Sequence, residues 1–228
     1  MNLALPLSSG RPKVDARWYQ EEAIAAIHRE FREVRSTLVV LATGLGKTVI
    51  FSMLATGWPG KVLVLAHRDE LVDQAKRSIE HISGEWSMKD KAHLKAELNV
   101  RLVIASVQTL SNDSRLKRYP RDHFSLVVVD EGHHATSPSY RKIIDYFNTA
   151  KVLYVTATPD RGDGTAMGLV AESVAYKMDI LDGITSGYLV PIADGFGHRV
   201  FLDEINLDDV HLQSGDLAIA QLDKAMLR

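Results

Sequence analysis

Five runs of apolar residues recur along the chain, and each run is continuous rather than alternating with polar positions. A strand that is buried on both faces has this pattern, which is typical of a parallel sheet. The pattern therefore predicts five parallel strands, over residues 37–43, 62–67, 100–106, 125–130 and 151–158.

The segments between these runs carry apolar residues at three- and four-residue steps, which predicts amphipathic helices. Such stripes cover residues 18–34 and 68–82, and a third helix is expected to end before the turn at residues 57–60. Strands that alternate with helices imply right-handed crossovers. The expected fold is therefore a three-layer α/β domain with a mainly parallel sheet.

The chain after Gly187 has a different composition. Residues 189–192 are a candidate for one more short strand, and residues 217–227 for a short helix, with an acidic stretch between them. This part has too few apolar residues for a second core. We expect a flexible N-terminal segment at 1–16, one domain at 17–192, and a linker or lead-in to an absent domain at 193–228.

The composition excludes several classes of protein. The 228 residues include no cysteine, which rules out disulfides and thiolate metal sites. No apolar stretch approaches ~18 residues, and the N-terminus has no basic region before its apolar patch, so neither a membrane span nor a secretory signal is expected. With 27 basic against 29 acidic residues, any polyanion must bind to a local groove. We expect a cytoplasmic protein, or a nuclear one if the source is eukaryotic.

Polar or small residues follow each predicted strand. Ligands of an open parallel sheet bind beyond the carboxyl ends of its strands, so these clusters are expected to converge on one edge. The clusters read ATGLGKT, AHRDE, SVQT, DEGHH and TATPDR in chain order.

The first cluster lies between a predicted strand and a predicted helix, which is the context of a phosphate-binding loop. Its glycines let backbone N–H groups face a phosphate, and the helix N-terminus adds partial positive charge. Lys47 is expected to reach the outer phosphates and Thr48 to contact Mg²⁺. The strict pattern has glycine where this chain has Leu41, and a plain glycine-rich turn is the alternative. The residues expected to hold the nucleotide are Thr43, Gly44, Leu45, Gly46, Lys47 and Thr48.

The fourth cluster places Asp130 and Glu131, here called the acidic pair, at the end of a buried strand. Asp130 is a candidate ligand for Mg²⁺, and Glu131 could polarise a water for attack on a γ-phosphate. A transition-metal site of Glu131, His133 and His134 is an alternative, although neighbouring histidines at a strand end do not share a face easily.

The ordered set ATGLGKT, DEGHH and TATPDR resembles the first motor domain of superfamily 2 helicases and translocases. The branch it resembles contains restriction-enzyme motor subunits and excision-repair helicases of the DExH type. The resemblance covers about residues 17–192 and implies a RecA-like P-loop NTPase domain. It also implies ATP and Mg²⁺ as cofactors, with Lys47, Asp130 and Glu131 as the catalytic residues.

Other positions match the family in turn. Arg17 and Gln20 resemble its adenine-reading motif, although Trp18 stands where the family often has proline, and a solvated Gln20 is the alternative. Residues of two further motifs would contact nucleic-acid phosphates, and a third motif would couple nucleotide state to nucleic-acid grip. Ordinary helix-start charges and strand ends are the alternatives. The phosphate-contacting residues would be Arg68, Ser106, Gln108 and Thr109, and the coupling residues His133, Thr156 and Thr158.

The basic residues Arg115, Lys117, Arg118 and Arg121 are interpreted as a solvated face at the opposite edge of the sheet. A nucleic-acid track on the motif edge would not reach them there.

The family works with two motor lobes, and the second lobe supplies arginines to the γ-phosphate. This chain has no second phosphate-flanking unit, so the second lobe is missing or is supplied by another chain. We expect the bare lobe to bind ATP weakly and hydrolyse it slowly or not at all. The resemblance favours DNA over RNA as the partner. A non-catalytic binding module and a phosphoryl-transfer kinase are the alternatives.

Overall fold

The computed structural model describes residues 15–67, 69–92, 94–132, 135–157 and 171–190, and the backbone of two short strands nearer the C-terminus. The chain divides into two compact units. The larger unit comprises Met1–Arg161 and Thr165–Leu189, and the smaller comprises Gly162–Gly164 and Val190–Arg228. In the smaller unit, β8 (Leu212–Gln213) pairs antiparallel with β9 (Asp216–Leu217). Leu217 therefore lies in a strand, whereas the rest of the predicted 217–227 helix lies outside the described residues.

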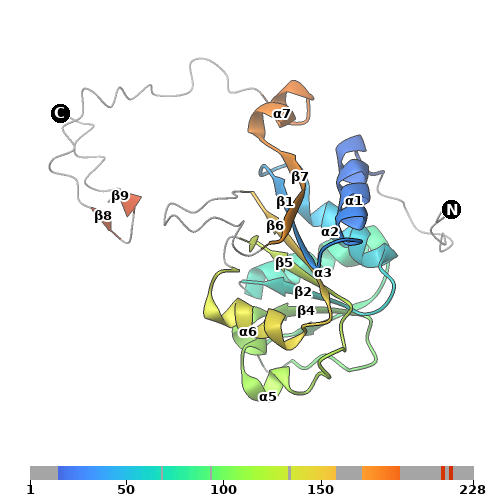
Figure 1. Ribbon diagram of the computed structural model, residues 1–228, viewed down its shortest axis with the longest axis vertical. Coiled ribbons are helices and arrows are strands. Elements are labelled where there is room, and N and C mark those ends of the chain that lie inside the picture. Colours follow the sequence, from blue (N-terminus) through green and yellow to red (C-terminus); the bar gives the residue numbers. More distant parts are fainter. Residues whose placement is uncertain are drawn as a thin grey trace. The chain divides into compact units, whose positions relative to one another are not determined.

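The larger unit contains a seven-stranded sheet in which every strand pair is parallel. The five predicted strands are confirmed as β1, β2, β4, β5 and β6 (Figure 1). In sheet order the strands are β3 (Ser87–Asp90), β4 (Leu102–Ser106), β2 (Val62–Ala66), β5 (Leu126–Asp130), β6 (Lys151–Thr156), β1 (Ser36–Leu41) and β7 (Ser173–Met178).

The two edge strands, β3 and β7, were not predicted. Lys89 is only half-buried within β3, and Val174 and Lys177 are exposed within β7. An edge strand is covered on fewer sides than a central one, so its sequence does not need a continuous apolar run. The criterion that found the central strands therefore misses the edges.

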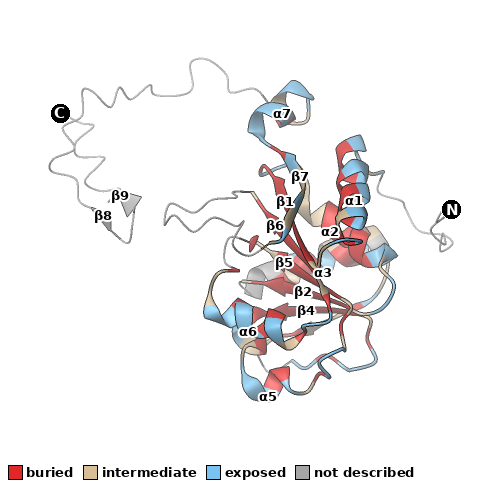
Figure 2. Ribbon diagram, viewed as in Figure 1, coloured by how far each residue is buried: buried red, intermediate tan, exposed pale blue. Residues whose placement is uncertain are grey.

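Helices cover both faces of the sheet, which confirms the three-layer fold. Along β2, Val62 and Val64 pack in one core cluster while Leu63 and Leu65 pack in the other. Figure 2 shows the strands as an almost continuous buried layer between partly exposed helices. One face carries α1 (Trp18–Glu30), α2 (Lys47–Gly57) and α3 (Asp69–Ser83), and the other carries α4 (Val107–Leu110), α5 (Asp113–Leu116) and α6 (Pro138–Tyr146).

The chain turns sharply after α7 (Ile180–Thr185), which follows β7. Gly187 has a φ of 74°, and the N–H groups of Tyr188 and Leu189 both donate to the carbonyl of Gly183. Leu189 and Val190 are not in a strand, so that part of the proposed 189–192 strand is wrong, because this turn bends the backbone out of an extended path. Residues 191 and 192 lie outside the described residues.

The helix predicted at 18–34 is shorter than expected. It ends at Glu30, and hydrogen-bonded turns continue to Val34. Phe31 is nevertheless buried and packs with α1 in the same core cluster. The apolar stripe therefore marks the buried face correctly but not the end of the helix.

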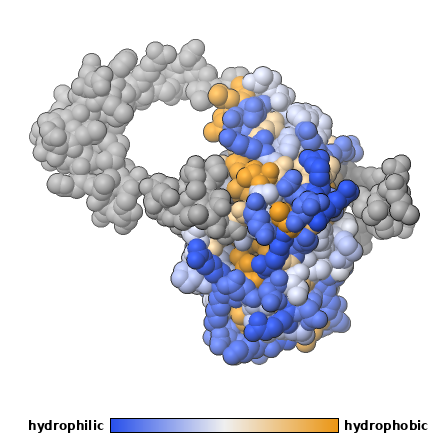
Figure 3. Space-filling model, in the orientation of Figure 1, coloured by the Kyte–Doolittle hydropathy of each residue, from blue (hydrophilic) through white to orange (hydrophobic). Residues whose placement is uncertain are grey.

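The visible surface is not uniform in character. Hydrophobic residues appear over α7 and along β7, whereas the face over α5 and α6 is mostly hydrophilic (Figure 3). Ile180, Leu181 and Val174 are the exposed large apolar side chains of the α7 and β7 region. Among the described helices, none has both the length and the apolar character needed to cross a bilayer.

Candidate functional site

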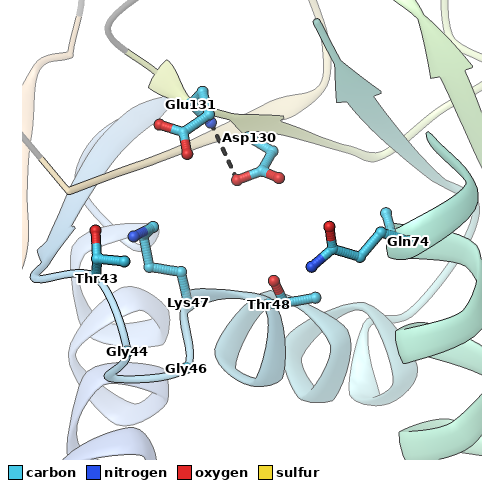
Figure 4. A pocket seen from close by; sticks show the side chains of 9 residues that line it. Thr43, Gly44, Gly46, Lys47, Thr48, Gln74, Asp130 and Glu131 are labelled. Atoms are coloured by element: carbon cyan, nitrogen blue, oxygen red, sulfur yellow. Dashed lines mark hydrogen bonds between the residues drawn. The ribbon is translucent and has the colours of Figure 1, made fainter. Parts of the chain in front are cut away.

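A pocket of about 400 Å³ opens at the carboxyl ends of the central strands. Figure 4 shows side chains from the loop after β1 and the start of α2 on one side, facing the acidic pair at the end of β5. Seven of the nine lining residues were predicted from sequence to bind nucleotide, metal or the attacking water. The pocket is lined by Thr43, Gly44, Gly46, Lys47, Thr48, Gln74, Ala75, Asp130 and Glu131.

The loop between β1 and α2 has the backbone shape that a phosphate cradle requires. Gly44 and Gly46 have φ values of 90° and 81°, a region that glycine enters without steric cost. A Cβ on Gly46 would also lie 2.6 Å from the amide nitrogen of Gln20. Helix α2 begins at Lys47, so its unpaired N–H groups face the same pocket.

Lys47 is tethered only weakly in this pocket. Its ammonium group lies 3.4 Å from the carbonyl of Leu41, which is a long hydrogen bond. Figure 4 shows the amino group on the side of the pocket that faces Glu131. The ammonium is thus available to an incoming anion such as a phosphate.

The two neighbouring carboxylates of the acidic pair repel each other and are only partly offset by nearby positive charge. Burial and the charge of Glu131 raise the pKa of Asp130 to about 6, against opposing effects of the Glu131 N–H group and Lys47. The Glu131 N–H donates to Asp130 Oδ1 at 3.0 Å, and Glu131 itself has a φ of 53°. Left-handed backbone is uncommon for a residue with a side chain and marks strain that functional sites often retain. A cation at this position would favour the ionised form of Asp130.

The donor set suits a magnesium ion. The Thr48 hydroxyl and the Asp130 carboxylate both line the pocket, and both offer oxygen ligands. Within the described ranges, no group of three or more histidine, aspartate or glutamate residues could hold a metal alone. Mg²⁺ commonly uses one or two protein ligands together with substrate phosphates. The alternative site with His133 and His134 involves residues outside the described part of the chain.

Gln74 was not found by sequence reasoning. It lies on α3, and its amide faces into the pocket beside Thr48 (Figure 4). The apolar stripe of α3 indicates which residues are buried, including Ala75, but not which helix lies next to it. Only the packing of α3 against α2 brings Gln74 to the pocket.

Arg17 and Gln20 lie behind the phosphate loop rather than in the pocket. Gln20 Oε1 accepts from the Arg17 N–H at 3.0 Å, and its Nε2 donates to the Leu45 carbonyl at 3.3 Å. The Tyr19 hydroxyl donates to the same carbonyl at 2.9 Å. Leu45, predicted as a nucleotide-binding residue, therefore uses its carbonyl to anchor the loop to α1. Adenine recognition by Arg17 and Gln20 stays a prediction.

The segment after α7 also contacts this region. The Arg17 guanidinium lies 4.9 Å from the ring centre of Tyr188, which packs edge-on to Tyr19 at 5.0 Å. A Cβ on Gly44 would lie 3.0 Å from the Leu189 side chain. Tyr188 and Leu189 are thus neighbours of the phosphate loop, a placement that arises from β7 and that no local sequence signal indicates.

The predicted phosphate contacts Ser106, Gln108 and Thr109 lie together at the end of β4 and on α4. The Ser106 and Thr109 hydroxyl groups are 2.9 Å apart, and Thr109 Oγ1 accepts from the Ala92 N–H at 3.0 Å. Ser106 is buried, whereas Gln108 is exposed. Ser106 and Thr109 hold the local structure, and Gln108 is the one of the three directed to solvent.

The remaining predicted residues are only partly covered. Arg68, His133 and Thr158 lie outside the described residues. Thr156 is buried at the end of β6. The residue before it, Val155, pairs with Asp130 of β5 in the sheet. The coupling role of these residues stays a prediction.

The interpretation of the basic cluster as a solvated face is wrong for two of its members. Asp90 ends β3 at the same edge as the pocket; Arg115 contacts its carboxylate at 3.4 Å, and so does Arg118. Arg115 also donates to the Leu94 carbonyl at 2.8 Å, and Arg118 to that of Ala96 at 3.1 Å. These arginines hold the loop after β3, which sequence alone could not show because β3 was not predicted.

The parallel sheet, the glycine-bearing loop before α2 and the opposed acidic pair define a RecA-like domain of the P-loop NTPase class. The order of the motifs is that of the first motor domain of superfamily 2 helicases. Residues 13–161 match the model of the family described as type III restriction enzyme, res subunit, and the chain belongs to this family.

Known relatives extend the comparison. The putative ATP-dependent helicase IRC3 of Saccharomyces cerevisiae is 33% identical over 92% of this chain and 32% of its own length. The type I restriction enzyme EcoAI endonuclease subunit of Escherichia coli is 30% identical over 77% of this chain and 23% of its own length. The chain thus spans a third or less of the length of these relatives.

Solved structures share the fold. The helicase domain of Hef from Pyrococcus furiosus is 28% identical and superposes with a TM-score of 0.57 over 71% of this chain and 38% of its own. The type ISP restriction-modification enzyme LlaGI, solved with a DNA substrate mimic, has a TM-score of 0.62 at 17% identity. The superposition covers 76% of this chain and 21% of the LlaGI chain.

Proposed function

We propose that this chain is the ATP-binding lobe of a nucleic-acid-dependent ATPase, a helicase or translocase that acts on DNA in preference to RNA. The observation that carries the proposal is the meeting of Lys47, Thr48, Asp130 and Glu131 in one pocket. A degenerate binding module would not need a lysine, a hydroxyl and two carboxylates around one pocket.

Each residue has a distinct role in hydrolysis. Lys47 and the N–H groups of the loop bind the β- and γ-phosphates. Thr48 and Asp130 would hold Mg²⁺, which neutralises phosphate charge when bound. Glu131 accepts a proton from the attacking water as the new bond to the γ-phosphorus forms. The bond from that phosphorus to the bridging oxygen breaks, and ADP leaves with the electron pair.

The nucleic acid is expected at the sheet edge beside the pocket. Gln108 is exposed there, and in the sequence Arg68 comes two residues after the end of β2. Contacts to phosphates do not distinguish DNA from RNA, so the DNA preference depends on the relatives. Their names include a restriction endonuclease subunit and the DNA 3'-5' translocase XPB2 of Sulfurisphaera tokodaii.

A second motor lobe completes the site in this proposal. An arginine from that lobe would contact the γ-phosphate and supply about 10³–10⁵ in rate, as arginine fingers do. We propose that the lobe belongs to the same protein or to a partner chain, and that the protein works inside the cell, where ATP and DNA are available.

The test is ATP hydrolysis by the full protein, without nucleic acid and with single-stranded DNA, duplex DNA or RNA. The comparison is with Lys47→Ala, and Lys117→Ala on the surface is the matched lysine control. We expect DNA-stimulated turnover that Lys47→Ala abolishes and the control retains. Turnover that survives Lys47→Ala, or a wild-type protein that neither binds nor hydrolyses ATP, would contradict the proposal.

A further inference from the structure

The turn after α7 lies beside the phosphate loop, outside the pocket. The N–H groups of Tyr188 and Leu189 both donate to the carbonyl of Gly183 at 2.9 Å, so the backbone of these two residues is fixed to α7. Both side chains are half-buried and pack against the core cluster that contains Leu45. A segment far along the chain is thus held next to the loop that follows β1.

The Leu189 side chain fits between two glycines. A Cβ on Gly44 would lie 3.0 Å from Leu189 Cδ2, and a Cβ on Gly183 would lie 2.7 Å from Leu189 Cδ1. The same Cβ on Gly183 would lie 3.1 Å from the Leu45 side chain. The two methyl groups of Leu189 therefore occupy the space that side chains at both glycines would need, and one of them lies beside the backbone of the phosphate loop.

The Tyr188 ring contacts the residue that anchors this loop to α1. It packs edge-on to the Tyr19 ring, with the ring centres 5.0 Å apart. The Tyr19 hydroxyl accepts from Arg17 Nη1 at 2.9 Å and donates to the Leu45 carbonyl at 2.9 Å. The Arg17 guanidinium also lies 4.9 Å from the centre of the Tyr188 ring. Tyr188 therefore helps to fix the tyrosine that holds the loop at Leu45.

A phosphate-binding loop depends on such support from other segments. Its N–H groups must stay free for the ligand, so the backbone hydrogen bonds of a helix or a sheet cannot hold its shape. Its two glycines, Gly44 and Gly46, also lose more conformational freedom on folding than other residues do. A loop that already has its binding shape loses less free energy to ordering when the ligand binds.

We infer that Leu189, supported by Tyr188, is a positioning residue for the nucleotide: it holds the phosphate loop in the shape that binds the phosphates of ATP. Leu189 itself does not line the pocket, so it acts on affinity through the loop and not on the chemical step. The inference rests on the proposed function, because it assigns a role at the same nucleotide site.

The matched variants are Leu189→Ala and Leu181→Ala, which shorten two leucines of the α7 region in the same way. Leu181 is 72% exposed and serves as the control. In the full protein, Leu189→Ala is expected to weaken Mg–ATP binding about tenfold in calorimetry, because the loop must then be ordered during binding. The KM for ATP should rise by a similar factor, and kcat at saturating ATP should stay within about twofold of wild type. Leu181→Ala should leave all three values unchanged.

Inorganic tripolyphosphate with Mg²⁺ separates the phosphate loop from any contact to the base. It carries the phosphates of ATP without adenine, so its binding reports on the loop alone. We expect Leu189→Ala to weaken tripolyphosphate and ATP by the same factor, measured by displacement of a fluorescent ATP analogue. Leu189→Met keeps nearly the same side-chain volume and should restore both affinities.

Leu189→Val is a milder variant that removes one methylene group and replaces Leu189→Ala where the alanine variant does not fold. It is expected to weaken both ligands about threefold. A melting temperature lowered without any loss of affinity would show that Leu189 has only a structural role, and would overturn the inference.

Two further results would overturn it. One is a loss of affinity for ATP but not for tripolyphosphate, which would place the effect at the base. The other is an equal loss in Leu181→Ala, which would make the effect independent of the loop contact. A wild-type protein that does not bind Mg–ATP overturns the proposed function and this inference together. Wild-type binding that Leu189→Ala and Leu189→Val both retain overturns the inference alone.

Discussion

Asp90 and Asp130 are the last residues of two parallel strands and lie at the same edge of one sheet. Asp90 is fully buried and meets Arg115, Arg118 and the Tyr119 hydroxyl. Asp130 meets the carboxylate Glu131, the Glu131 N–H group and the more distant Lys47. One aspartate is surrounded by donors and cations, and the other is left with excess negative charge.

The difference separates a structural carboxylate from a functional one. The carboxylate of Asp90 is paired with two arginines and a phenol, although its Oδ1 makes no hydrogen bond among the described residues. The pocket at Asp130 has no comparable set of partners, and the pKa of its carboxyl is raised to about 6. Keeping that carboxylate ionised costs stability in the absence of a cation. At this sheet edge, Asp130 is therefore the carboxylate that we expect a cation to stabilise.

Glu131→Gln is expected to have the largest effect. It keeps the shape of the side chain but removes the proton acceptor, so kcat for ATP should fall by about 10²–10⁴. Binding of Mg–ATP should remain within a few-fold of wild type, as measured by calorimetry. Retained turnover would show that Glu131 is not the base, and the acidic pair would then be only a metal-binding feature.

Asp90→Asn is expected to destabilise the fold by about 3–5 kcal/mol, because it leaves two arginines beside a buried neutral group. Denaturant unfolding measures this change. Asp113→Asn is the control, since Asp113 is exposed and pairs with Lys117 at the surface. The control should change stability by at most about 0.5 kcal/mol. Equal losses of stability in the two variants would contradict the structural role assigned to Asp90.

Asp130→Asn is expected to act in the opposite direction. The pKa of Asp130 is raised from 3.8 to about 6 in the folded protein. The contribution of this carboxyl group to the free energy of unfolding is therefore greatest below pH 3.8, where the group is protonated in both states. It is lost as the pH rises through 6, because the folded protein must then hold the disfavoured ionised form. At pH 8 without ligand, the variant should be more stable than wild type by about 1–3 kcal/mol. Its stability should also vary less between pH 4 and 7, as thermal unfolding across pH will show.

Gly46→Ala should have a smaller effect on stability but a clear one on the site. An alanine at position 46 must adopt a left-handed backbone, and its Cβ must displace the Gln20 amide. We expect these two effects together to lower the free energy of unfolding by about 1–3 kcal/mol. Gly187→Ala is the matched control, since Gly187 also has a positive φ but open space around it. Only Gly46→Ala should weaken Mg–ATP binding. Comparable nucleotide affinity in the two variants would contradict the role of the loop shape.

The central features of this protein could be predicted from sequence because they depend on local patterns. Continuous apolar runs identify the strands that are buried on both faces. The order of the glycine loop and the acidic pair places Lys47 and Asp130 at one edge, since carboxyl ends of parallel strands meet there. These predictions need only the chain direction and the burial of each strand.

The features that were missed depend on contacts between segments far apart in the chain. Gln74 reaches the pocket through the packing of α3 on α2, and Leu189 reaches the phosphate loop through β7. Arg115 was misplaced because its partner, Asp90, ends an edge strand with little apolar character. Sequence periodicity describes which face of an element is buried but not which element covers it.

The central claim is that the cation of Mg–nucleotide balances the negative charge of Asp130 and Glu131. Isothermal titration calorimetry of ATP, with and without Mg²⁺, tests it directly in wild type and in Asp130→Asn. We expect wild type to bind ATP much more tightly with Mg²⁺ than without it, and Asp130→Asn to lose most of that difference. Equal affinity with and without Mg²⁺ in the wild-type protein would contradict the claim.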